Sequence, residues 1–62
     1  MELGLYTIPN SSINIKVTEV IKVGQQSTTL NIFYLYKSGM VIDYETVTVP
    51  NDALSNWIKL NE

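Results

Sequence analysis

Residues 28–44 read TTLNIFYLYKSGMVIDY, and this stretch decides the fold. Two runs rich in β-branched and aromatic residues, 30–36 and 40–44, flank the dipeptide Ser38-Gly39. Such runs are typical of strands, and small flexible residues between them are typical of a tight turn. The stretch therefore predicts a β-hairpin, and the segments on either side of it are expected to cover one of its faces.

The length of the hairpin loop determines which side chains share a face. A two-residue loop would mix charged and apolar side chains on both faces. A three-residue loop at 37–39 brings Tyr36 opposite Met40. It also brings Tyr34 opposite Ile42 and Ile32 opposite Tyr44, and one face, which the helix is expected to cover, then becomes almost wholly apolar. Because this loop places a glycine at the left-handed position that ends it, turn chemistry agrees with the pattern, and we predict the three-residue loop.

The segment from Ile13 to Val23 predicts another strand, because apolar and polar residues alternate along it. Glu19 and Val20 are out of phase with this alternation. A local bulge or an exposed sheet edge explains both residues, and a carboxylate placed in a pocket is the functional alternative for Glu19. A four-residue loop at 24–27 joins this strand to the hairpin, brings Ile21 opposite Leu30, and places the two apolar faces on the same side.

The strand that begins at Met40 is expected to continue to Pro50, because residues 46–49 favour β-structure. Its alternation changes phase on the way. Val47 and Val49 fall on the face opposite to that of Met40 unless a bulge near residues 45–46 resets the pattern.

The two ends of the chain are expected to complete the domain. Residues 1–9 predict either an edge strand or an extended arm that lies on a neighbouring subunit. Residues 51–60 predict a C-terminal helix, since Leu54, Trp57 and Ile58 recur at the i, i+3, i+4 spacing. So short a helix is not stable alone, and we expect it to dock on the apolar face of the sheet.

Together these segments predict a single α+β domain over residues 1–62. It consists of a small antiparallel three-stranded β-meander at 13–49, a possible N-terminal fourth strand, and a C-terminal α-helix packed on one face. The expected core anchors are Trp57, Leu54, Ile58, Tyr34 and Ile42. The opposite face and the N-terminal segment carry a second apolar set, which predicts a protein interface: Val20, Phe33, Leu35, Val41, Val47, Leu3 and Leu5.

The composition excludes several kinds of chemistry. The chain has no cysteine and no histidine, so disulfides, thiolate or imidazole metal sites and histidine-dependent nucleophilic catalysis are all excluded. We therefore predict a protein that is not an enzyme and that has no cofactor and no metal. A net charge of −2, with four lysines and no arginine, also disfavours nucleic-acid binding.

The length of the chain favours association with other proteins. A 62-residue domain buries only about 60% of its unfolded surface, so its stability is marginal without help. We expect a homo-oligomer or a part of a large assembly. The N-terminal residues show no signal-peptide pattern, and no apolar run is long enough for a membrane span. We therefore expect a soluble, unprocessed protein with no membrane partner, in a virion or the host cytoplasm.

The segment TVTVPNDALSNWIKL at 46–60, which closes the β-meander, resembles small accessory virion proteins of tailed bacteriophages in its layout. These are minor capsid, decoration or connector proteins, and the resemblance implies a non-catalytic structural component that acts through protein–protein contacts. Two alternatives remain. One is a small regulatory module that inhibits a host protein, and the other uses the tyrosine-rich face to bind a ligand or single-stranded nucleic acid.

Overall fold

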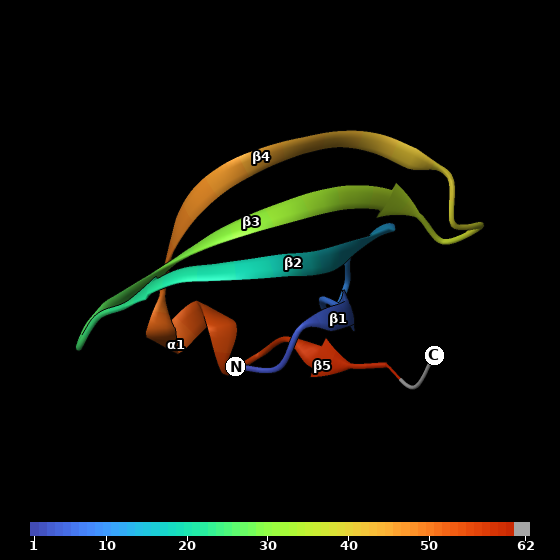
Figure 1. Cartoon of the computed structure of the whole chain (residues 1–62). Coiled ribbons are helices and arrows are strands. Elements are labelled where there is room, and N and C mark those ends of the chain that lie inside the picture. The colour runs from blue at the N-terminus through green and yellow to red at the C-terminus, as the bar shows by residue number, and fades with distance from the viewer. Residues whose placement is uncertain (61–62) are drawn as a thin grey trace.

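The computed structural model describes residues 1–60, which form one antiparallel sheet and a short helix. The strands are β1 (Gly4–Thr7), β2 (Ile13–Val23), β3 (Ser27–Tyr36), β4 (Val41–Pro50) and β5 (Ile58–Lys59), and the helix is α1 (Asn51–Leu54). The five strands lie in the order β4-β3-β2-β1-β5 (Figure 1). Within residues 1–60, no helix has the length and apolar character needed to cross a membrane.

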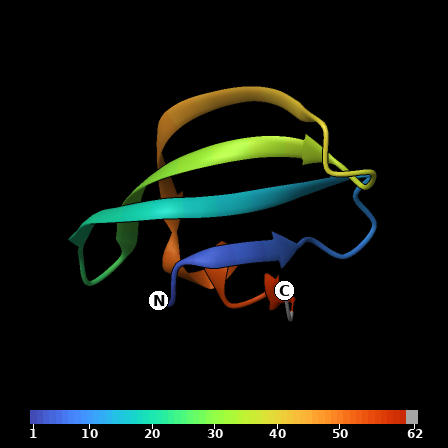
Figure 2. The ribbon, with the colours of Figure 1, turned by 45° about the vertical axis from the view of Figure 1, so that its right-hand side comes forward.

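The sheet curls strongly around its own core. β4 arches over one side of the molecule, whereas β1, α1 and β5 lie on the other side, so the sheet forms a half-open barrel (Figures 1 and 2). Leu30, in the middle of β3, is fully buried at the centre. The other buried members of the core are Tyr6, Ile15, Val17 and Ile32. Half-buried side chains that pack against this cluster are Ile8, Val20, Tyr34, Val47, Leu54 and Trp57.

The predicted small antiparallel α+β domain is confirmed in outline, but the expected strand count and helix are wrong. Residues 4–7 form a strand that pairs with β2 of the same chain, rather than an exchanged arm. The helix spans only four residues, and the chain then turns so that β5 pairs with β1. Two features explain this outcome. The Ser55 hydroxyl bonds back to the Asp52 carbonyl at the helix end, and β1 offers an otherwise open backbone edge to β5.

Both predicted hairpin loops are confirmed. The Tyr36 N–H donates to the Met40 carbonyl at 2.9 Å, which closes the three-residue loop. Gly39 has a φ of +99°, a conformation that costs glycine least, and its N–H donates to the Tyr36 carbonyl. At the other end of the sheet, Val23 lies opposite Thr28, as the four-residue loop requires.

Two irregularities in β2 explain the residues that break its alternation. The register with β3 shifts between Val17 and Glu19, and again between Val20 and Lys22. The bulge interpretation is therefore confirmed. Its consequence is that Val20 lies opposite Leu30 and packs on the core, whereas Ile21 is 51% exposed. The expected pairing of Ile21 with Leu30 is wrong, because each bulge moves the following side chains to the other face.

A third irregularity lies in β4, earlier than the sequence suggested. Leu35 pairs with Val41 and Tyr34 pairs with Asp43, which leaves Ile42 as the extra residue. The predicted pairing of Tyr34 with Ile42 is therefore wrong. A bulge does reset the alternation of β4, but it lies at Ile42 and not near residues 45–46. Because of it, Val47 faces the core opposite Leu30.

Candidate protein-interaction site

The end of the β3–β4 hairpin carries a cluster of exposed apolar side chains, which we call the tip surface. Its members are Tyr36 (51% exposed), Met40 (67%), Val41 (53%), Ile42 (43%) and Tyr44 (72%). They make up half of the large exposed apolar residues in the described part of the chain. Exposed apolar side chains gathered at one end of a domain often mark a contact with another molecule.

The sheet geometry explains why these side chains are not covered. The hairpin loop projects past β1, α1 and β5 (Figure 1). Near its end Tyr36 pairs with Ile13 of β2 and the Lys37 ammonium donates to the Thr7 hydroxyl, and these contacts leave Met40, Val41 and Tyr44 exposed. The bulge at Ile42 then determines which side chains turn outward. Tyr44 lies opposite Phe33 on the convex face, where the two rings meet edge to face with centroids 5.8 Å apart. An aromatic pair in this geometry stabilises its own orientation, so the Tyr44 ring is held in place although it is exposed.

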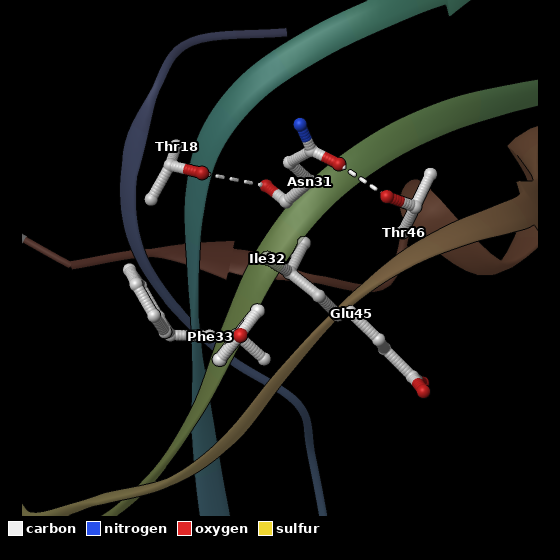
Figure 3. Close-up of a pocket in the computed structure, with 7 residues that line it drawn as sticks. Thr18, Asn31, Ile32, Phe33, Glu45 and Thr46 are labelled. Carbon is white, nitrogen blue, oxygen red and sulfur yellow. Dashed lines mark hydrogen bonds between the residues drawn. The ribbon is translucent and has the colours of Figure 1, made fainter.

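A shallow pocket of about 420 Å³ opens beside the tip surface. It is lined by Thr18, Asn31, Ile32, Phe33, Tyr44, Glu45 and Thr46 (Figure 3).

Hydrogen bonds fix the polar wall of this pocket. The Asn31 side chain donates through Nδ2 to Glu19 Oε1 at 2.8 Å and accepts from the Thr46 hydroxyl. The Thr18 hydroxyl, at the first bulge of β2, donates to the Asn31 carbonyl at 3.1 Å (Figure 3). Glu19 on β2 therefore orients the Asn31 side chain on β3. Its carboxylate is exposed, so the prediction of a carboxylate buried in a pocket is wrong.

An acidic pair lies on the concave side of β4. Asp43 and Glu45 pair with Tyr34 and Ile32 of β3, and both acidic residues are exposed. The Tyr34 hydroxyl donates to Glu45 Oε1 at 2.5 Å. This hydrogen bond raises the pKa of Tyr34 to about 12, and burial together with the negative charges of Glu45 and Asp43 acts in the same direction. The two carboxylates therefore place negative charge on the concave side of β4, on the half of the strand nearer the hairpin loop.

The opposite side of the core holds the C-terminal segment. The Trp57 ring lies against Tyr6 with the centroids 6.1 Å apart, and the Lys59 ammonium lies 5.9 Å from the centroid of the same tyrosine. The Tyr6 hydroxyl donates to the Glu2 carbonyl at 2.6 Å. Burial is the main reason that the pKa of Tyr6 is raised, with the Glu2 charge adding to it. These contacts hold the C-terminal segment against β1.

The structure distributes the predicted interface residues over several environments. Val20 and Val47 are half-buried against the core, Leu35 is buried, and Phe33 is half-buried in the pocket wall. Val41 and Leu3 are exposed, whereas Leu5 is half-buried on β1. Only Val41 and Phe33 of this set lie at the tip surface or its pocket.

The predicted core anchors divide in a similar way. Trp57, Leu54 and Tyr34 pack half-buried against the core, whereas Ile42 is 43% and Ile58 is 54% exposed. Sequence reasoning missed Tyr44, because an unbroken register placed it under the helix. The signal that could have found it is the phase change in β4, which requires a bulge somewhere before Val47.

Within residues 1–60, no three acidic side chains lie close enough together to hold a metal ion. Comparisons of the chain with protein-family models, curated proteins and solved structures returned no match. The geometry of the tip surface is therefore the basis for the functional proposal.

Proposed function

We propose that this protein is a non-catalytic assembly component that works through protein–protein contacts made by the tip surface. The observation that carries the proposal is the gathering of exposed apolar side chains at one hairpin end. Burial of apolar surface releases about 25 cal/mol per Å², so covering this region would stabilise a complex. It would also supplement the limited core of a small domain.

The chemistry around the tip surface favours protein over nucleic acid as the partner. Tyr44 is an exposed ring on which a base could stack, but Asp43 and Glu45 flank it in the sequence. The two carboxylates lie on the other face of the sheet from Tyr44, but they contribute to a net charge of −2, and the chain has no arginine to neutralise a phosphate backbone. An extended apolar segment with basic residues at its margin fits the same surface better.

The layout resemblance to accessory virion proteins extends the proposal to a component of a tailed-phage particle. Detection of the protein in purified particles tests this extension separately from the contact itself.

The absence of cysteine from the chain permits a direct test of the contact. Met40→Cys introduces a single thiol at the tip surface, and Val23→Cys introduces one of nearly equal exposure at the opposite end of the sheet (67% and 69% for the native residues). Each variant is labelled with a photoactivatable thiol reagent and irradiated in cells that make the protein. We expect defined cross-linked products from position 40 and few from position 23. Equal yields from both positions would refute the tip surface as the contact site.

A further inference from the structure

The outer edge of β4 is a free sheet edge ten residues long. β4 is the first strand in the sheet order, and β3 is its only neighbour among the described strands. Figure 1 shows no other element along the outer side of β4. An open edge of this kind presents a row of backbone donors and acceptors to other chains.

Two hydrogen bonds show which backbone groups of β4 point outward. The Tyr44 N–H donates to the Asp43 carboxylate at 2.8 Å, and the Asn51 N–H donates inward to the Gln26 carbonyl. Because N–H groups alternate between the two sides of a strand, the backbone groups of Thr46 and Thr48 point outward as well. Pro50 follows in the same series and has no N–H, as is usual for proline on a sheet edge.

The side chains divide this edge into a protected half and an open half. Toward the hairpin, the edge carries the bulge at Ile42 and the acidic residues Asp43 and Glu45, which are features that discourage strand addition. Residues 46–49 read Thr-Val-Thr-Val, which is uncharged and favours β-structure strongly. Strand addition is therefore directed to residues 46–49.

We propose that β4 pairs antiparallel with β4 of a second copy of this chain, centred on Val47, so that the two sheets join into one. The proposal goes beyond the proposed function, because residues 46–49 lie on the half of β4 that is farther from the tip surface. In this arrangement Thr46 lies opposite Thr48 of the second copy, and the two outward-facing residues exchange their backbone hydrogen bonds. Val47 lies opposite its own counterpart.

The charges of β4 select this register over its neighbours. If the pair is centred on Glu45, the two Glu45 carboxylates lie opposite each other. If it is centred on Tyr44, Asp43 lies opposite Glu45 of the second copy. Each of these registers is destabilised by repulsion between like charges. Centring on Thr46 makes the two Glu45 side chains diagonal neighbours, roughly 7–8 Å apart. Centring on Val47 separates them further and places Glu45 opposite an uncharged valine, Val49. Centring on Thr48 places Pro50, which has no N–H, opposite Thr46 beside the centre of the pair and so removes a backbone bond there, whereas centring on Val47 moves Pro50 to the ends of the pair, opposite Tyr44.

A charge-pairing experiment tests the proposal. Thr46→Lys/Thr48→Lys and Thr46→Glu/Thr48→Glu each place like charges opposite each other, whereas an equal mixture of the two places opposite charges together. The control Gln25→Lys/Gln26→Lys adds the same charge in an exposed loop. In sedimentation equilibrium at low salt, we expect the wild type and the control to dimerise and each β4 variant to dimerise about tenfold more weakly, with affinity recovered in the mixture. Circular dichroism verifies that each variant is folded.

The single variant Thr46→Lys/Thr48→Glu tests the register itself. Centred on Val47, each introduced lysine faces an introduced glutamate and dimerisation tightens; centred on Thr46, lysine faces lysine and it weakens. A wild type that stays monomeric, or β4 variants that dimerise like the control, would overturn the pairing with a second copy. Cross-linking from position 40 to a different protein would then still support the proposed function, so the two proposals fail separately.

Discussion

Val20 and Ile21 are adjacent residues for which the bulged sheet and an unbroken alternation predict opposite roles. In the structure Val20 packs against the core opposite Leu30, and Ile21 is 51% exposed. Without the bulges, Ile21 would face the core instead. We therefore compare Val20→Thr with Ile21→Thr. Threonine keeps the β-branched shape and the strand preference, so the comparison isolates burial from backbone propensity.

The expected difference follows from the burial of the two side chains. Val20→Thr replaces a methyl group by a hydroxyl in a half-buried site, where an unpaired hydroxyl costs about 1–2 kcal/mol. Ile21→Thr changes an exposed side chain and should alter the free energy of unfolding by about 0.5 kcal/mol or less. A chain of this length has a total stability of about 3–9 kcal/mol, so the Val20 variant loses a substantial fraction.

Urea unfolding followed by Trp57 fluorescence measures both values, since this ring packs on the core. Thermal unfolding should show the Val20 variant melting about 4–8 °C lower for each kcal/mol lost, with the Ile21 variant near the wild type. A larger loss for Ile21→Thr than for Val20→Thr would refute the bulged register of β2.

Two further predictions concern the aromatic residues. Trp57→Ala should lower the free energy of unfolding by roughly 2–3 kcal/mol, below the cost for a fully buried tryptophan because the ring is half-buried; a loss under about 0.5 kcal/mol, measured by urea unfolding, would contradict its packing on Tyr6. The pKa of Tyr34 is raised from 10.0 to about 12, so its stabilising contribution is complete below pH 10 and disappears as the pH rises through 12. Spectrophotometric titration against Tyr34→Phe should show this, and Glu45→Gln should move the titration to lower pH; an unchanged titration in that variant would contradict the hydrogen bond.

Local chemistry allowed the hairpins to be predicted from sequence. Gly39 at a left-handed position fixed the loop at 37–39, and the loop at 24–27 followed from the small and polar residues between two strands. The bulges were harder to locate. A break in the alternation of apolar and polar residues shows that a strand contains an extra residue, but it does not show which residue this is. In β4 the slip lies at Ile42, several residues before the first visible change of phase at Val47.

The same limit explains the missed helix end and the missed tip surface. Leu54, Trp57 and Ile58 fit a helical stripe, but they fit equally well a single turn followed by a strand, and the open edge of β1 decided between these alternatives. Tyr44 was expected in the core because its position depends on the slip at Ile42. A single extra residue in β4 therefore places the most exposed tyrosine ring at the candidate interaction site, although it was predicted to lie in the core.

Methyl and aromatic NOESY spectra of the folded protein test the central claim most directly, namely that three bulges decide which side chains form the core and which are left at the tip. The structure predicts cross-peaks from Leu30 to both Val20 and Val47, and between the Phe33 and Tyr44 rings. Cross-peaks from Leu30 to Ile21, or from Tyr34 to Tyr44 across one face, would contradict it.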